Sequence, residues 1–192
     1  WNMPQTITIR SVTDGFDDGN IPFKITFPSA TGAAEYVAKR PTSSNASYNN
    51  ALGELTLTNT DDDTIGFTIS AANPFPITEG AAAGTFSVVL KSDPCSTPGN
   101  LATCTSQAVT FTLTNNDPTQ YSISPSSLTF AAGSWNSPQT ITVTPTNDSY
   151  DENNMDFTLV LNSITSTSDY GGQNPADVTV RVIDNDTKAI NL

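Results

Sequence analysis

The sequence predicts an all-β protein: an antiparallel β-sandwich in which a partial unit precedes one complete unit. Three observations lead to this fold class. Short stretches alternate apolar residues with Thr or Ser, turns rich in Asn, Asp and Gly separate them, and one long stretch occurs twice. No part of the 192 residues keeps an apolar period of about 3.6, so almost no helix is expected.

The repeat gives the chain an internal register. WNMPQTITIR at the N-terminus is matched by WNSPQTITVT 134 residues later, and Phe23 is matched by Phe157. A second match pairs residues 55–63 with residues 178–186, at an offset of 123. The difference between the offsets falls in a loop, where insertions are tolerated better than in strands.

Three strands are expected before residue 64. Ile7 and Ile9 alternate with threonines in residues 5–10, which indicates a strand with one buried face. The other two strands are residues 23–27 and 55–57, and residues 28–53 are expected to form a long loop.

The following unit is expected to hold seven or eight short strands. Pro74 and Pro76 interrupt the first of them, and residues 77–80 are expected to form a turn. Residues 162–177 are expected to be loop. The predicted strands are residues 67–69, 86–90, 109–113, 121–123, 128–130, 141–143, 157–161 and 178–182.

These elements divide the chain into three parts. Residues 1–63 are the last three strands of one unit, residues 64–186 are a complete unit, and residues 187–192 are the first strand of a following unit or a strand donated to a neighbour. Three strands cannot enclose a sandwich core alone. We therefore expect either a piece of a tandem array, as the start on Trp1 without Met also indicates, or a protomer that shares strands with copies of itself.

The net charge of −12 excludes nucleic acid as a partner, because phosphates require a basic face. No apolar run is long enough to cross a bilayer, so membrane insertion is not expected. The carboxylates cluster at turns, which favours cation binding over the alternative of an evenly solvated acidic surface.

The two cysteines, Cys95 and Cys104, flank one short polar loop. We expect a disulfide that closes this loop, and therefore an oxidising, extracellular or cell-surface location. The alternative is a pair of free thiols in a cytosolic protein. Without His or further Cys, they could not build an ordinary zinc site.

The complete unit resembles a Calx-beta domain. The stretches that carry the resemblance are Thr-Glu-Gly at residues 78–80 with FSVVL at 86–90, the central LTF, TITV, Asn-Asp and FTL motifs between residues 128 and 159, and VTV through IDND at 178–186. The resemblance implies a β-sandwich that collects calcium at one tip through carboxylates of three segments.

Carried over to this sequence, the implied ligands fall into two sets. In the complete unit they are Glu79, Asp148, Glu152, Asp184 and Asp186, with Asp117 near the position of a further family ligand. In the partial copy they are Asp14, Asp18, Asp61, Asp62 and Asp63. Met155 and Ile21 occupy a position that is often acidic in the family, which predicts fewer ions or weaker binding.

The chemistry of calcium agrees with this implication, since Ca²⁺ takes six to eight hard oxygen ligands and this chain has no His. The alternative is a solvated acidic linker that keeps strand ends from aggregating.

We therefore expect a non-catalytic extracellular module for structure or adhesion, stiffened by calcium, in a repeat-containing surface protein or fibre. The alternative is a module that binds a glycan or a protein ligand. Trp1 and Trp135 could stack on sugars, although their shared place before a strand favours packing. An enzyme is not expected, because the chain has no His for a triad and its acidic turns are too polar to raise a catalytic pKa.

Overall fold

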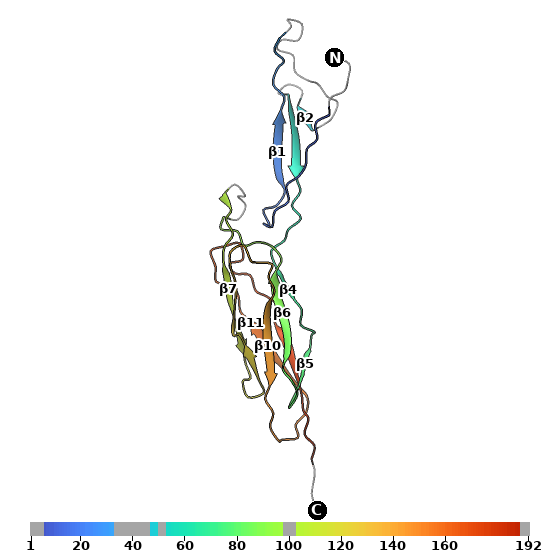
Figure 1. Cartoon of the computed structure of the whole chain (residues 1–192), viewed down its shortest axis with the longest axis vertical. Helices are drawn as coiled ribbons and strands as arrows, with labels where there is room; N and C mark the ends of the chain where they lie inside the picture. The colour runs from blue at the N-terminus through green and yellow to red at the C-terminus, as the bar shows by residue number, and fades with distance from the viewer. Residues whose placement is uncertain (1–5, 33–46, 50–52, 98–102, 189–192) are drawn as a thin grey trace, which may run out of the picture. The chain divides into compact units, whose positions relative to one another are not determined.

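The computed structural model describes residues 6–32, 47–49, 53–97 and 103–188. Trp1, much of the predicted 28–53 loop and residues 189–192 lie outside these ranges. The internal contacts divide the chain into two units: unit 1 is residues 1–14 and 18–62, and unit 2 is residues 15–17 and 63–192 (Figure 1). A search of the described residues for a helix of membrane-spanning length and hydropathy finds none.

Unit 1 holds one three-stranded antiparallel sheet. Its strands are β1 (Ile21–Thr26), β2 (Tyr48–Asn49) and β3 (Glu54–Asn59), in the order β1-β3-β2. Phe23 lies opposite Leu57 in the register of β1 and β3. The two-residue strand β2 was not predicted, because nothing in its loop alternates in polarity.

Unit 2 is a β-sandwich of two sheets. One sheet has the order β4-β6-β10-β8, and the other has the order β5-β12-β11-β7-β9. The strands are β4 (Phe67–Ile69), β5 (Phe75–Thr78), β6 (Gly84–Leu90), β7 (Val109–Asn115), β8 (Tyr121–Ser124), β9 (Ser127–Phe130), β10 (Gln139–Pro145), β11 (Met155–Leu161) and β12 (Val178–Ile183).

The core of unit 2 lies between these two sheets. Alternate residues of each strand point inward, as the burial of β7 shows: Val109, Phe111 and Leu113 are buried, whereas the threonines between them are exposed. The ring of Phe67 meets that of Phe111 edge-on at 6.0 Å and so joins one sheet to the other. The alternation read from the sequence therefore identified the core-facing side of the strands.

The first strand of the unit, β4, ends at Ile69 before the prolines, as predicted, but the strand β5 that follows was not predicted, and Ile77 and Thr78 belong to it instead of to the expected turn. Pro76 lies within β5, which pairs with β12 in parallel and places Phe75 opposite Val180. β5 is the edge strand of its sheet, so the missing proline N–H removes no ladder hydrogen bond to a second neighbour.

The strand predicted at residues 5–10 is also not formed in the described residues 6–10. Its repeat counterpart in unit 2 is β10, which is held between β6 and β8. Among the described residues of unit 1, no strand corresponds to β6 or β8. The same sequence pattern therefore lacks the ladder partners that make it a strand in unit 2.

The segment predicted as loop at residues 162–177 contributes a buried anchor to unit 2. Tyr170 is fully buried, and its hydroxyl accepts from the backbone N–H of Ser92 at 3.1 Å and lies 3.2 Å from the carbonyl oxygen of Gly66. This one hydroxyl links the loop to the chain before β4 and after β6. The ring also packs edge-on against Phe67 at 5.7 Å.

Cys95 and Cys104 form a disulfide, as the sequence predicted. Cys95 is buried, and its backbone N–H donates to Oδ1 of Asp169 at 2.9 Å. The bridge lies in the β6–β7 connection of unit 2, at the end of β6 away from Glu79.

Candidate metal centre

The C-terminal ends of β5 and β12 lie side by side at one end of unit 2 because the two strands run in parallel. Glu79 follows β5 directly, Asp184 follows β12 directly, and the backbone N–H of Glu79 donates to the carbonyl oxygen of Ile183 at 3.0 Å. The acidic loop after β10, residues 146–154, reaches the same end. Three segments that are distant in sequence thus converge there.

Three carboxylates face one another at this end. Glu79, Asp184 and Asp186 each offer an oxygen within 4.8 Å of the other two. Glu79 is only 4% exposed. Its Oε2 atom and the Oδ2 atom of Asp186 are buried and accept no hydrogen bond from the part of the chain that the structure describes. Buried oxygens of this kind normally have a partner, so these two call for one.

Burial raises the pKa of Glu79, and the charges of Asp148, Asp184, Glu152 and Asp186 raise it further. The five carboxylates therefore repel one another in a partly desolvated space. A cation between them would reverse both effects, because it would offset the repulsion and take up the unpartnered oxygens.

Amide side chains bind the converging segments together. Asn185 Nδ2 donates to the carbonyl oxygen of Glu79 at 2.7 Å and to Oδ1 of Asn147 at 3.1 Å. Gly80, with φ of +67°, leaves the space for them: a Cβ at Gly80 would lie 2.7 Å from Asn185 Nδ2 and 2.8 Å from Asn147 Oδ1. This arrangement could not be predicted from the sequence, because the Asn-Asp motifs give no sign of which side chains meet.

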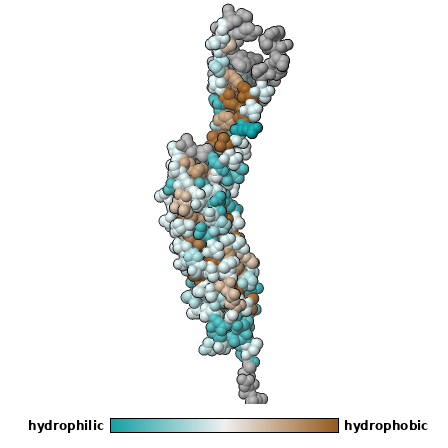
Figure 2. Space-filling view, viewed as in Figure 1, coloured by the Kyte–Doolittle hydropathy of each residue, from teal (hydrophilic) through white to brown (hydrophobic). Residues whose placement is uncertain are grey.

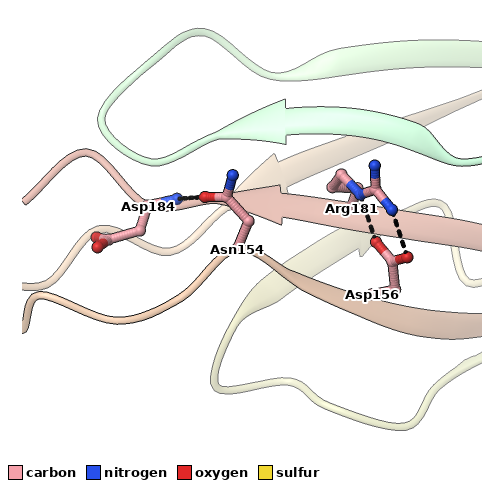
Figure 3. Close-up of polar contacts among 4 residues, drawn as sticks. All are labelled: Asn154, Asp156, Arg181 and Asp184. Atoms are coloured by element: carbon pink, nitrogen blue, oxygen red, sulfur yellow. Dashed lines mark hydrogen bonds and ion pairs between the residues drawn. The ribbon is translucent and has the colours of Figure 1, made fainter.

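Backbone groups orient the carboxylate of Asp184. Its Oδ2 accepts from the N–H of Glu152 at 2.8 Å, and its own N–H donates to Oδ1 of Asn154 at 3.1 Å (Figure 3). The Oδ1 atom accepts from the N–H of Asp186 at 3.1 Å. The acidic loop and the segment after β12 are therefore bound to each other at Asp184, although Glu152 enters the contact through its backbone.

A neighbouring acid is already neutralised. Arg181 Nε and Nη2 each donate to one oxygen of Asp156 at 2.7 Å, across β12 and β11 (Figure 3). The guanidinium holds the pKa of Asp156 below its usual range. Because Asp156 is paired with Arg181, we do not count it among the candidate cation ligands. It follows Met155, which occupies the position expected to be acidic from the family resemblance.

The structure places the other predicted ligands differently. Asp148 and Glu152 lie close enough to act on Glu79 through their charge, and Oδ1 of Asp148 accepts from the N–H of Tyr150 at 2.7 Å. Asp117 is not part of the carboxylate group: its Oδ1 accepts from the hydroxyl of Thr119 at 2.6 Å in the β7–β8 turn.

The acids of the partial copy show less convergence. Asp61, Asp62 and Asp63 offer oxygens within 4.8 Å of one another, but all three come from one short segment and not from separate segments. Oδ2 of Asp61 accepts from the N–H of Gly19 at 2.7 Å. Asp14 and Asp18 belong to neither carboxylate group found among the described residues.

The donor set at the end of unit 2 fits a calcium ion. It consists of carboxylate oxygens from Glu79, Asp184 and Asp186, with Asp148 and Glu152 beside them, and it contains no nitrogen or sulfur ligand. Hard oxygens carried by loops suit Ca²⁺, whose coordination is flexible. The two unpartnered buried oxygens would supply two of the ligands.

Comparison with known proteins agrees with this arrangement. No curated protein matches the chain. The family model of the Calx-beta domain matches residues 60–186, which is more than half of the 192 residues and covers all the strands of unit 2. Calx-beta is a β-sandwich family linked generally to calcium binding, and unit 2 has two packed sheets and a group of carboxylates at one end. The chain therefore belongs to the Calx-beta domain family.

Proposed function

We propose that this protein is a non-catalytic extracellular module for structure or adhesion, stiffened by Ca²⁺ bound at the acidic end of unit 2. The observation that carries the calcium assignment is the pair of buried, unpartnered oxygens on Glu79 and Asp186. Asp184 would complete the inner ligands, and Asp148 and Glu152 would add charge.

Calcium would act by joining chain segments. Glu79 belongs to the start of unit 2, whereas Asp184 and Asp186 belong to its end. One ion between them would hold both together, and Asp151, whose Oδ2 accepts from the N–H of Lys188 at 3.0 Å, would extend the order beyond β12. Stiffening at a domain end would suit a structural or adhesive protein.

The location and the absence of catalysis are proposed on separate grounds. The Cys95–Cys104 disulfide supports an oxidising, extracellular setting, and Calx-beta is a family of non-catalytic domains. The glycan-binding alternative gains no support from Trp135, because its ring packs against the core of unit 2 and lies beside Gly15.

Thermal unfolding of the full chain in EDTA and in Ca²⁺ tests the proposal. We expect Ca²⁺ to raise the Tm of unit 2 by several degrees, because an ion at about 100 times its Kd stabilises by roughly 2.7 kcal/mol. Mg²⁺ at the same concentration serves as the control, since its octahedral shell fits a flexible carboxylate set poorly.

Two matched variants locate the effect. Glu79→Gln should abolish the Ca²⁺-dependent rise, whereas Asp117→Asn, an acid in another turn of unit 2 outside the carboxylate group, should keep it. An unchanged Tm of the wild-type chain in Ca²⁺ would refute the calcium site. If Asp117→Asn lost the Ca²⁺-dependent rise in Tm while Glu79→Gln kept it, the ion would not bind at the carboxylate group of Glu79.

A further inference from the structure

Unit 1 presents an open apolar face. Ile9, Val12, Phe23 and Leu57 line a hollow of about 450 Å³ together with Arg10, Ser11, Thr58 and Asn59, all within unit 1. Figure 2 shows apolar side chains gathered over the strands of this unit. Large apolar side chains here are unusually exposed, with Ile7 at 65%, Ile9 at 43% and Phe23 at 38%.

The internal repeat shows what such a face does when it is complete. Ile7 and Ile9 correspond to Ile141 and Val143, which are fully buried in unit 2. The same sequence position is therefore core in one copy and surface in the other. The difference lies in the neighbours and not in the residues themselves.

The strand register of unit 1 is already that of the complete unit. Phe23 lies opposite Leu57 in β1 and β3, and their repeat counterparts Phe157 and Val180 lie opposite each other in β11 and β12. The two ladders share this register although Phe23 and Phe157 are 134 residues apart and Leu57 and Val180 are 123 residues apart. Among the described residues, unit 1 thus reproduces the β11–β12 ladder of unit 2 with only the two-residue strand β2 beside it.

Unit 2 identifies the missing contacts. Phe86 of β6 lies opposite Ile141, Phe75 of β5 lies opposite Val180, and the ring of Tyr121 in β8 lies 6.2 Å from that of Phe157. All three covering residues come from residues 64–134, the part of the unit that has no counterpart in unit 1.

The edge of β1 that faces away from β3 leads to the same segment. In unit 2 the corresponding strand β11 pairs on its other side with β7, where Leu161 lies opposite Leu113. Among the described residues, β1 pairs only with β3. In the part of unit 1 that the structure describes, both the apolar face and the strand edge therefore lack partners that this segment supplies in unit 2.

We propose that the open apolar face of unit 1 is a docking surface for a strand-forming polypeptide segment with the pattern of residues 64–134. Docked, the segment would place its Phe86-type residue over Ile7, its Phe75-type residue beside Leu57 and its Tyr121-type residue against Phe23. Residues 6–10 would then gain ladder partners and form the strand that their alternation predicts. The surface is independent of the calcium site of unit 2.

The repeat offset defines the test. A second copy of residues 64–134 fused directly before Trp1 restores the Ser-Trp junction found at residues 134–135. Hydrogen exchange of the β1 and β3 amides is then compared between the natural and the extended chain. We expect exchange to slow by about tenfold or more on extension, as strands pass from an open sheet into a closed core.

The control extension carries Phe75→Asn, Phe86→Asn and Tyr121→Asn in the added copy only. It should leave β1 and β3 exchanging as in the natural chain, while β10–β12 of unit 2 report that the rest of the protein is folded. Unchanged exchange with the intact extension, or equal slowing with the control, would overturn the proposal.

Discussion

At the scale of single residues, Glu79 combines burial with unmatched charge. Its Oε2 atom has no hydrogen-bond partner among the described residues, and four other carboxylates act on it. Without a cation, the charged form of this side chain destabilises the fold. The same residue should therefore weaken the protein in EDTA and strengthen it in Ca²⁺.

This makes the pH dependence of stability a sharp measure of Glu79. The pKa of Glu79 in the folded state is raised above the ordinary value of 4.5. The stability that depends on its protonated form is therefore fully present below that value and is lost as pH rises through the folded pKa. In EDTA, we expect the wild-type chain to lose stability on this rise. Glu79→Gln should lose less stability over the same rise. At neutral pH its free energy of unfolding should exceed that of wild type by roughly 1 kcal/mol, and its Tm should be higher accordingly.

The measurement is a series of denaturant or thermal transitions from pH 4.5 to 8 for both chains in EDTA. The difference between the chains cancels the general repulsion of an acidic protein. A constant difference across this range would contradict the raised pKa.

Gly80 is the second residue on which the site depends. Gly80→Ala would place a methyl group on Asn185 and Asn147 and force an unfavourable φ, so we expect a loss of roughly 1–3 kcal/mol in unfolding free energy. The displaced amides should also weaken Ca²⁺ binding measured by calorimetry. Gly133→Ala, which has a similar φ of +72° but open space around it, separates the backbone cost from the contact cost.

At the scale of elements, the repeat offers a paired comparison. Ile141 lies in the core of β10, whereas its counterpart Ile7 is mostly exposed. Ile141→Ala should lower the unfolding free energy of unit 2 by about 2–5 kcal/mol, and Ile7→Ala should cost less than about 0.5 kcal/mol. Chemical denaturation followed by intrinsic fluorescence measures both. Equal costs would mean that residues 6–10 are packed in solution.

The contrast between Ile7 and Ile141 also explains which strands could be predicted from the sequence and which could not. Alternation correctly located ten of the strands, since inward and outward positions are set locally by the pleat. It wrongly assigned a strand to residues 6–10 because a strand also needs neighbours, which the local pattern does not reveal. It missed β5 because Pro76 is tolerated at a sheet edge, and edge position is a property of the whole sheet.

The candidate site was predictable in composition and less so in geometry. Resemblance to the family pointed to Glu79, Asp184 and Asp186, which the fold does bring together. It also pointed to Asp117, which its own turn retains through Thr119. The bridging by Asn185 depends on the parallel pairing of β5 with β12, and no local motif encodes that pairing.

At the scale of the whole molecule, unit 2 is held at both ends by different means. The acidic centre lies where β5 and β12 end, and the disulfide lies in the connection after β6. Cys95→Ser with Cys104→Ser should lower the unfolding free energy by about 2–3 kcal/mol, because the bridge closes a short loop. The Ca²⁺-dependent rise in Tm should persist.

Thermal unfolding of the double variant with and without Ca²⁺ measures both effects at once, and the oxidised and reduced wild-type chains provide the reference. If removal of the bridge also abolished the response to Ca²⁺, the two ends would be coupled, and stabilisation by calcium could no longer be assigned to the acidic end alone.

The parallel pairing of β5 with β12 has a mechanical consequence. Tension applied between Phe75, where β5 begins, and Ile183, where β12 ends, runs along the ladder and not across it. All the hydrogen bonds between the two strands would then resist sliding together, instead of opening one after another like a zip. An ion between Glu79 and Asp184 would clamp the far end of that ladder. The β5–β12 ladder would therefore resist such a pull in shear.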